Sequence, residues 1–382
     1  MPGGNRKSTM KILHISKYYY PYFGGVENIC KYIVDNSKDH QVAVLCFNEG
    51  RNDTVDIVDD VVVYRVASWI NISRQALSLS YFTMLKRALS EFKPEVIHFH
   101  WANPFPAAVL LCMIPKKVKL VVHWHMDIIK QSTIYHFIKP FETALLRRAD
   151  IVVVTSPQYR DGSRPLHPFR GKVRVVPNAI DESNFVLHSG DKEKIENIRK
   201  RYAYKKIVFF IGRHIQYKGL PWLVEAEKYV KSDCVFVVAG AGPLTDQLKE
   251  ECQSKRVFFV GRLSDKELVW HHMAASVFAF PSITKNEAFG VALAEAMYCY
   301  TPAVTFTIEG SGVNWVNLNG MTGIECPNKD SKAFAAAIDK LLSDDNLARE
   351  YAVAAHRRVV ENFTIPKMME KMDAVYAEIY SG

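Results

Sequence analysis

The chain has no apolar stretch long enough to cross a membrane as a helix. A bilayer-spanning helix needs about 20 predominantly apolar residues, whereas the longest apolar run, AAVLLCMI, covers only residues 107–114. The N-terminal segment MPGGNRKST is polar, and the apolar run after Met10 is only as long as a strand, so no secretory signal peptide is indicated. These absences predict a cytoplasmic protein in which residues 1–9 form a flexible leader.

Cysteine is sparse and follows no pattern. The chain has 7 cysteines, an odd number, and no two of them are spaced as C-x-x-C. Several lie within apolar segments, which is typical of reduced thiols in a protein core. Neither a disulfide framework nor a structural zinc site is therefore expected.

The charge balance lacks an acidic surplus and is uneven along the chain. There are 24 Lys and Arg against 16 Asp and Glu in residues 1–190, but 25 against 24 in the remainder. A basic first half predicts an anionic partner such as nucleic acid, an acidic membrane surface or a phosphorylated substrate. Nucleic acid is disfavoured, because the basic residues are dispersed and no nucleic-acid-binding signature is found.

The chain does contain a repeated alternation of short apolar strands with amphipathic helical patterns. In the first half the expected strands are KILHIS (11–16), HQVAVLCF (40–47), VVVYRV (61–66), EVIHFH (95–100), KLVVHWH (119–125), DIVVVTS (150–156) and KVRVVPNAID (172–181). After a charged helical linker the pattern restarts with KIVFFIGR (206–213), CVFVVAGAG (234–242), RVFFVGRL (256–263), VFAFPS (277–282) and TPAVTF (301–306). Continuous apolar strands separated by helices predict parallel sheets covered on both faces. The expected fold class is α/β, with two doubly wound, Rossmann-like domains.

The alternation also predicts the domain boundaries. We expect an N-terminal domain over residues 10–187 and a C-terminal domain over residues 188–364. Residues 365–382 form an amphipathic helix, which we expect to pack back on the N-terminal domain. Ligands of doubly wound sheets bind at the carboxyl ends of the strands. A deep cleft between the two domains is therefore the expected site.

The segment NEAFGVALAEA (286–296) carries two carboxylates next to a helix start. Gly290 would let backbone N–H groups approach a phosphate closely at the helix N-terminus. Glu287 lies just outside that end, and Glu295 lies roughly 7–8 Å further along the helix. A carboxylate accepts hydrogen bonds from two neighbouring hydroxyls. The pair therefore suits a ligand with hydroxyls on both sides of a phosphate, although surface glutamates are the plainer alternative.

The segment GRHIQYKG (212–219) supplies opposite charge at the end of another expected strand. Arg213 suits bidentate binding of phosphate and Lys218 acts as a point charge. Either residue alone would be read as an ordinary surface cation. Their position on a loop bounded by glycines at a strand end favours a diphosphate site.

Together these segments resemble the large GT4 family of retaining, nucleotide-sugar-dependent glycosyltransferases, whose fold is GT-B. The resemblance is carried by G-R-x(4)-K-G, E-x(7)-E, VPNAID, VAGAGPL, FVGRLSDKEL and NGMTG. It runs from about Met10 to the C-terminus. It is most specific in residues 207–327 and looser before residue 180.

The resemblance implies that the C-terminal domain binds the donor. Glu287 would bind hydroxyls of the donor sugar and Glu295 the ribose hydroxyls, while Arg213 and Lys218 would hold the diphosphate. The remaining donor-binding positions are Ala288, Phe289 and Gly290, whose backbone would lie near the sugar and phosphates, and Arg262 and Leu263, which would line the base.

In the N-terminal domain, which would bind the acceptor, Gly24 and Gly25 would face the diphosphate and acceptor. HWHMD resembles the family's H-x-D segment, which makes His125 the active-site histidine and places Asp127 on the acceptor side. Strand alternation puts His123 and His125 on one face. A metal clip and a pair of sheet histidines are both open alternatives, and we favour a functional His125 beside a structural His123.

The expected reaction transfers a sugar from a nucleoside diphosphate sugar to a hydroxyl of a glycan or lipid-linked glycan, with retention. GSGVNWVNLNGMTG (310–323) resembles bacterial mannosyltransferases of surface polysaccharide synthesis, which favours GDP-mannose over UDP-sugars. No D-x-D motif is present, and the basic loop makes a metal ion unnecessary, so no cofactor is expected. A sugar-nucleotide epimerase, a phosphorylase or a catalytically inactive nucleotide-sugar binding protein remain alternatives. GAGPLT (240–245) imitates a dinucleotide-binding loop only weakly, because Thr245 replaces its last glycine.

Basic residues on two expected helices provide a reason for membrane association. Lys86 and Arg87 lie on one helix, and residues 134–150 add Lys139, Arg147 and Arg148. We expect peripheral attachment to the anionic inner leaflet, where a lipid-linked acceptor would be found. Plain solubilising charge is the alternative.

Overall fold

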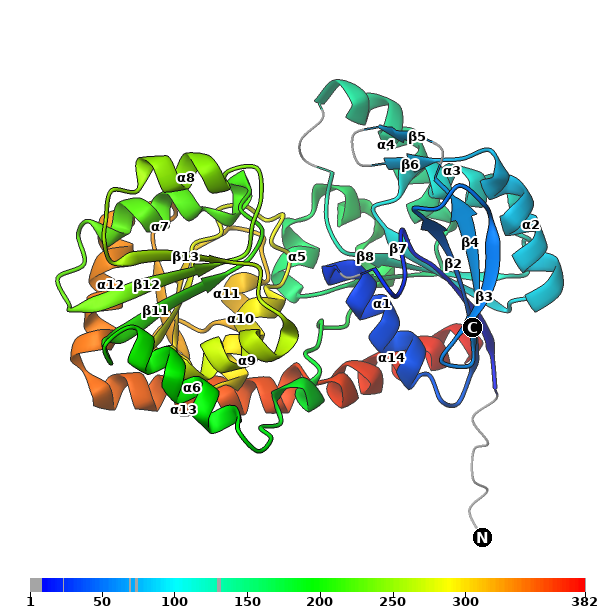
Figure 1. The fold of residues 1–382 in the computed structure, drawn as a ribbon. Coiled ribbons are helices and arrows are strands. Elements are labelled where there is room, and N and C mark those ends of the chain that lie inside the picture. Colours follow the sequence, from blue (N-terminus) through cyan, green and yellow to red (C-terminus); the bar gives the residue numbers. More distant parts are fainter. Residues whose placement is uncertain (1–8, 23, 69, 73–74, 129–131, 382) are drawn as a thin grey trace, which may run out of the picture. The chain divides into compact units, whose positions relative to one another are not determined.

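The computed structural model describes residues 9–22, 24–68, 70–72, 75–128 and 132–381, so most of the expected leader lies outside the described residues. The chain forms two compact units: one runs as far as Val176 and resumes at Met369, and the other runs from Pro177 to Met368. Each unit contains a mainly parallel sheet with helices on both faces (Figure 1). The predicted α/β class with two doubly wound units is confirmed.

The sheet of the first unit has the strand order β10-β9-β8-β7-β1-β2-β4-β3, and only the edge strand β3 runs antiparallel to its neighbour. The strands are β1 (Lys11–Ile15), β2 (Gln41–Asn48), β3 (Thr54–Val58), β4 (Val61–Ala67), β7 (Val96–Trp101), β8 (Lys119–Trp124), β9 (Ile151–Val154) and β10 (Val173–Val175). Every residue of β7 is buried, as expected for a central strand covered on both faces. A separate hairpin pairs β5 (Ile70–Ile72) with β6 (Gln75–Leu77).

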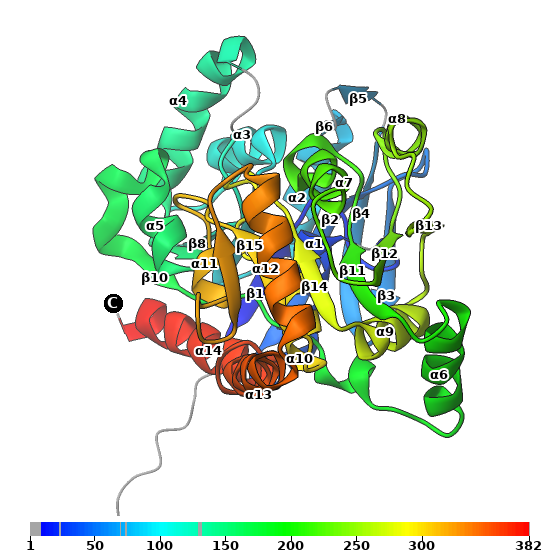
Figure 2. The same cartoon turned by 90° about the vertical axis from the view of Figure 1, so that its left-hand side faces the viewer.

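The helices of the first unit follow the apolar patterns of the sequence. They are α1 (Gly25–Asn36), α2 (Ser80–Phe92), α3 (Pro104–Met113), α4 (Ser132–Arg148) and α5 (Pro157–Gly162). Figure 2 shows α3 beside α4, in agreement with their contacts. The last helix, α14 (Ile365–Ser381), contributes its part from Met369 onward to this unit. Within the described part of the chain, no helix is both long and apolar enough to span a bilayer.

The second unit has the strand order β13-β12-β11-β14-β15-β16, with all neighbouring strands parallel. Its strands are β11 (Lys206–Ile211), β12 (Cys234–Ala239), β13 (Val257–Gly261), β14 (Val277–Phe280), β15 (Ala303–Phe306) and β16 (Gly323–Cys326). Its helices are α6 (Asp191–Arg201), α7 (Leu220–Glu227), α8 (Thr245–Glu251), α9 (Asp265–Ala274), α10 (Val291–Tyr298), α11 (Val313–Val316), α12 (Ser331–Ser343) and α13 (Asp345–Asn362). Figure 2 shows α12 along β14 and β15, which it contacts.

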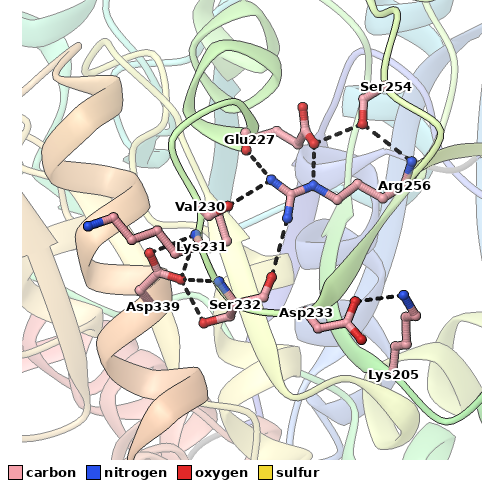
Figure 3. Close-up of polar contacts among 9 residues, drawn as sticks. All are labelled: Lys205, Glu227, Val230, Lys231, Ser232, Asp233, Ser254, Arg256 and Asp339. Carbon is pink, nitrogen blue, oxygen red and sulfur yellow. Dashed lines mark hydrogen bonds and ion pairs between the residues drawn. The ribbon is translucent and has the colours of Figure 1, made fainter.

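An ion pair joins Glu227, at the end of α7, to Arg256, just before β13 (Figure 3). The Arg256 guanidinium donates to the carboxylate of Glu227, to the Val230 carbonyl at 2.9 Å and to the Ser232 carbonyl at 3.2 Å. The Glu227 side chain is only 7% exposed. Because a buried charge must be paired, this network fixes the connection between α7 and β12.

Replacing Glu227 by Gln should lower the free energy of unfolding by about 2–3 kcal/mol, the usual contribution of hydrogen bonds to charged groups. Asp233→Asn is the matched control, because the Lys205–Asp233 pair in the same figure is exposed. That variant should lose less than about 1 kcal/mol. Equal urea midpoints for the two variants would contradict the stabilising role of the buried pair.

Candidate donor and catalytic site

The second unit has its topological switch point between β11 and β14. The two strands are neighbours, with Val208 opposite Val277. From β11 the chain proceeds to β12 and β13, whereas from β14 it proceeds to β15 and β16 on the other side. The loops that leave these two strands therefore diverge, and ligands of doubly wound sheets bind at that point. The charged segment 212–219 follows β11, and the charged segment 286–296 lies after β14.

The structure brings Lys218 and Glu287 into direct contact there. Lys218 Nζ donates to Glu287 Oε2, and Ser282 Oγ donates to the same oxygen at 3.1 Å. The two side chains are 13% and 11% exposed, so the pair is largely shielded from water. Burial alone would lower the Lys218 pKa, but the Glu287 carboxylate prevails and raises it above its ordinary value. Lys218 is therefore a fixed cation at the switch point.

Two glycines allow these loops to approach each other closely. Gly219 has φ +69°, and a Cβ on it would lie 1.8 Å from the Pro281 carbonyl oxygen. Gly290 has φ +92° and precedes α10, and a Cβ there would lie 3.2 Å from the Phe280 ring. Both backbone conformations disfavour other residues. The glycines thus position Lys218 and the N-terminus of α10 on adjacent loops.

The segment between Glu287 and α10 is held by its backbone. The Ala288 carbonyl accepts from the Gly312 N–H at 3.1 Å, and the Ser311 hydroxyl donates to the Glu287 carbonyl. The Phe289 side chain is buried against Phe363. The Phe289 side chain is therefore not open to a ligand, and its predicted role through backbone groups stays a prediction. The first N–H groups of α10 have no acceptor within the helix and suit an anion.

Glu295 lies on α10 in an environment that penalises its charge. Its side chain keeps 22% of its surface exposed, yet desolvation of the carboxylate, with a smaller contribution from Asp265, raises its pKa to about 7. His272 Nε2 lies 4.0 Å away, and burial lowers the His272 pKa to about 3, so this histidine supplies no counter-charge at neutral pH. An acidic group held in such surroundings is a functional-site candidate.

The other predicted donor positions lie on loops at the carboxyl end of the same sheet. Arg213 is exposed and follows β11. Arg262 and Leu263 lie between β13 and α9, where Arg262 is exposed and Leu263 is partly buried. Among the described residues no contact of Arg213 or Arg262 defines its role, and these assignments stay predictions.

The structure contains supporting residues that the sequence did not indicate. Thr245 Oγ1 accepts from the Gly242 N–H at 2.8 Å and lies 2.9 Å from His214 Nδ1. This contact joins the loops after β11 and β12. The glycine-rich segment 240–245, which imitates a dinucleotide-binding loop, therefore packs against the loop after β11. Ser282 and Ser311, which hold Glu287, were not singled out either, because single serines in a loop carry no local signal.

In the first unit, His125 directly follows β8 and is 5% exposed. Asp127 Oδ1 accepts from Trp124 Nε1 at 2.9 Å and from Ser163 Oγ at 2.7 Å. The Asp127 N–H donates to Tyr159 Oη at 2.6 Å. Asp127 therefore orders the loop that carries His125, and a direct role toward an acceptor stays a prediction.

Gly24 and Gly25 form the start of α1, which follows the loop after β1. Gly24 is extended, with φ −175°, and a Cβ on Gly25 would meet none of the described residues within 4 Å. The space above Gly25 and the helix N-terminus behind it are compatible with the predicted approach of a phosphate.

Comparison with known proteins identifies the family from both halves of the chain. Residues 23–184 match the family described as Glycosyltransferase Family 4, and residues 191–358 match the family described as Glycosyl transferases group 1. Together the two matches span most of the chain and include the loops described above.

Relatives cover almost the whole chain. The O-antigen chain mannosyltransferase C of Escherichia coli is 26% identical over 97% of this chain and 98% of its own length. The D-rhamnosyltransferase WbpZ of Pseudomonas aeruginosa is 27% identical over 93% and 92%. Among solved structures, a sucrose-phosphate synthase from Thermosynechococcus elongatus superposes with a TM-score of 0.79 at 20% identity, covering 97% and 99%. The predicted GT-B type of fold, with two parallel-sheet α/β domains, is confirmed. The chain belongs to the glycosyltransferases, with a family 4 N-terminal half and a group 1 C-terminal half, and is an enzyme of the hexosyltransferase class.

Proposed function

We propose that the enzyme transfers a sugar from a nucleoside diphosphate sugar, with GDP-mannose favoured, to a hydroxyl of a glycan or lipid-linked glycan. The product would enter a bacterial surface polysaccharide, and the anomeric configuration would be retained. The observation that carries this proposal is the meeting of Lys218 and Glu287 at the switch point beside α10. The names of the two relatives, a mannosyltransferase and a rhamnosyltransferase, support the acceptor and donor classes.

In this proposal each group at the switch point has one task. Lys218 and Arg213 neutralise the diphosphate, where negative charge grows as the bond to the sugar breaks. Glu287 accepts hydrogen bonds from hydroxyls of the transferred sugar, and Glu295 accepts them from the ribose. Lys218 is held in place by its ion pair with Glu287. A bound diphosphate would therefore share a cation that is in place before binding, which avoids reorganisation during the reaction.

The remaining assignments follow the same proposal. Arg262 and Leu263 line the base, Gly24 and Gly25 approach the diphosphate, and His125 hydrogen-bonds the transferred sugar. The acceptor hydroxyl attacks the anomeric carbon on the face that the diphosphate leaves, and a phosphate oxygen takes the hydroxyl proton. The sugar–oxygen bond to phosphate breaks as the bond to the acceptor forms, so the configuration is retained.

A donor panel tests the proposal directly. Purified enzyme is incubated with GDP-mannose or UDP-glucose, each with and without a polysaccharide-derived acceptor, and both released nucleotide and extended glycan are measured. We expect glycan extension with GDP-mannose. Extension with UDP-glucose alone would replace the donor while keeping the transferase. An altered sugar nucleotide in the absence of acceptor would indicate an epimerase, and nucleotide binding without product would contradict transfer.

Metal removal provides a second check. Because Arg213 and Lys218 supply the positive charge for the diphosphate, turnover should change less than about twofold after treatment with EDTA, whereas a metal that held the diphosphate would contribute several kcal/mol. Restoration of lost activity by Mg²⁺ or Mn²⁺ would show that a cation shares this role.

We further propose that helix α4 attaches the enzyme to the cytoplasmic face of an anionic membrane. Phe137 and Phe141 are separated by one helical turn and are 74% and 47% exposed. Lys139 between them is exposed too. Two exposed aromatic rings on one face of a helix that also carries an exposed cation suit the interface of an anionic bilayer. By contrast, Arg148 donates to the Val118 carbonyl at 2.5 Å and pairs with Asp150, so this arginine serves the fold.

Liposome flotation measures this attachment. The Phe137→Ser, Phe141→Ser double variant should lose most binding to vesicles that contain anionic lipid. Ile57→Ser, Leu79→Ser is the matched control, since it removes two exposed apolar side chains, 75% and 76% exposed, from other parts of the same unit. Equal flotation of all three proteins, or equal binding to neutral vesicles at low salt, would remove the proposal and leave solubilising charge as the explanation.

A further inference from the structure

A group of histidines lies buried on one face of the first unit's sheet. His14 is on β1, His98 and His100 are on β7, His123 is on β8, and His125 follows it. His14 is opposite His98 in the strand register, and His100 is opposite His123. Residues two apart on a strand share a face, so the strand alignment stacks all of these rings on the same side. All are at most 5% exposed.

The rings form two hydrogen-bonded tracks. In the first track, His14 Nδ1 lies 3.3 Å from His100 Nε2, and His100 Nδ1 lies 3.0 Å from His125 Nε2. In the second track, Tyr376 Oη lies 2.7 Å from His98 Nδ1, and His98 Nε2 lies 3.2 Å from His123 Nδ1. The tracks stack on each other, since His98 lies 4.7 Å from His100 and His123 lies 4.2 Å from His125 between ring centroids. His125 thus ends the first track.

The orientation of the rings disfavours a metal site at His98, His100 and His123. Ligand atoms of His98, His100 and His123 lie within 4.8 Å of one another. However, the rings of His98 and His100 are within 4° of parallel and are stacked, and His123 is tilted from them by only 25° and 21°. A nitrogen lone pair lies in the plane of its ring, so stacked parallel rings do not direct their lone pairs to one point. The same geometry suits hydrogen bonds between neighbouring rings.

The tracks are directional because the imidazoles are neutral. Burial lowers the pKa of His14 to about 3 and holds the pKa values of His100 and His125 well below their usual range. A neutral imidazole has one N–H donor and one acceptor nitrogen. Each ring of the first track therefore donates at one end and accepts at the other, and the proton position on one ring dictates the position on the next.

His14, at one end of the first track, determines which nitrogen donates in each of its hydrogen bonds. His14 Nε2 is buried and has no hydrogen-bond partner among the described residues. Among backbone groups, orphaned buried N–H donors are rarer than under-satisfied acceptors, and we apply the same preference to the imidazole. His14 therefore keeps its proton on Nδ1 and donates to His100 Nε2. His100 then donates from Nδ1 to His125 Nε2, which leaves the proton of His125 on Nδ1.

We propose that His14 and His100 are positioning residues that hold His125 as the Nδ1-protonated tautomer, so that it offers an N–H donor to an oxygen of the transferred sugar. This inference rests on the proposed role of His125 at the sugar. In the opposite tautomer, His125 would offer a lone pair at Nδ1 and bury an unpaired N–H at His14.

Histidine ¹⁵N NMR tests the tautomer without measuring activity. Uniformly ¹⁵N-histidine-labelled protein is compared with His100→Leu, His100→Asn and His98→Leu, and the His125 signal is assigned from its loss in His125→Ala. We expect Nδ1–H in the wild type. His100→Leu should shift His125 toward Nε2–H, whereas His100→Asn, whose amide N–H replaces the Nδ1 donor, should preserve Nδ1–H.

His98→Leu is the matched control, because His98 is on the same strand and equally buried but bonds Tyr376 and His123 instead of His125. It should leave the His125 tautomer unchanged. In parallel, kcat should fall roughly tenfold in His100→Leu, the effect of one lost hydrogen bond, with partial rescue in His100→Asn. Nε2–H in the wild type, or an unchanged His125 signal in His100→Leu, would overturn the inference. Normal turnover in His125→Ala with the expected tautomer shifts would instead overturn the role of His125 in the proposed function.

Discussion

Replacing Glu287 by Gln should reduce kcat about a hundredfold while leaving the fold intact. The carboxylate lies beside Lys218 and Ser282 at the switch point, where it is proposed to accept hydrogen bonds from the sugar. Hydrogen bonds to a charged group contribute about 1.5–3 kcal/mol each, and each 1.36 kcal/mol corresponds to a tenfold change in rate. Gln keeps the shape of the side chain but loses the charge and one acceptor. Initial rates of nucleotide release and glycan extension measure the loss.

The control for this variant is Glu225→Gln, an exposed carboxylate of the same unit that pairs with Lys228. It should retain wild-type turnover. Lys218→Met completes the set, because it removes the proposed diphosphate contact and leaves Glu287 without its cation. If Glu287→Gln turns over at the wild-type rate, or if only its thermal stability falls, the switch-point site is not where the sugar binds.

Replacing Glu295 by Gln should weaken nucleotide binding by about 10- to 100-fold at pH 8, the effect of hydrogen bonds lost from a charged acceptor. The Glu295 pKa of about 7 adds a pH signature. Only the ionised carboxylate is a full acceptor for the ribose hydroxyls, so wild-type affinity should fall as the pH drops below 7. In Glu295→Gln this component should vanish, while the pH dependence of the phosphate itself, common to both proteins, remains. Isothermal titration calorimetry with GDP at several pH values measures the affinity of both proteins.

Two controls separate ribose recognition from a general loss of structure. With 2′,3′-dideoxy-GDP, which lacks the ribose hydroxyls, the wild type and Glu295→Gln should bind alike. In Glu295→Gln at pH 8, the stability of the fold should rise while the affinity for the nucleotide falls. The Glu295 pKa is raised from 4.5 to about 7 by folding, so its ionisation destabilises the folded state increasingly between those pH values and fully above 7. Glu295→Gln should therefore raise Tm at pH 8, by an amount corresponding to at most about 3 kcal/mol, with little effect at pH 4.5. A variant that loses both Tm and affinity at pH 8 would indicate a structural role.

The alternation of strands and helices could be predicted from the sequence because each kind of element has its own pattern of apolar residues. KIVFFI and CVFVVA are apolar at successive positions and became β11 and β12, both central and buried on two faces. The edge strand β3 was not predicted. Its exposed and half-buried positions alternate and include Asp56, so it lacks the continuous apolar signal of the central strands. The short hairpin β5–β6 was missed for a related reason, since strands of three residues show no period.

The candidate site was predictable only as separate loops. Glycines and charges at strand ends marked 212–219 and 286–296, but Lys218 and Glu287 are 69 residues apart. Nothing local shows that they touch. Their contact arises because β14 is inserted beside β11, and strand order is decided by packing of the whole sheet. Glu295 similarly looked like a charge in an apolar helix, and only its desolvation in the fold explains a pKa near 7.

The buried histidines show most clearly which features the sequence predicts and which depend on the tertiary structure. Alternation within one strand placed His123 and His125 on a common face, and a structural His123 beside a functional His125 was the favoured interpretation. The partners that complete the two tracks come from elsewhere: His14 is 86 residues from His100, and Tyr376 is 278 residues from His98. By itself, the sequence determined which segments form strands, which strand ends carry charge and which family the chain resembles, because these are properties of neighbouring residues. Only the tertiary structure decided which charges pair, which imidazoles are hydrogen-bonded to each other and which carboxylate is desolvated, because those depend on strands that are neighbours in the sheet but distant in the chain.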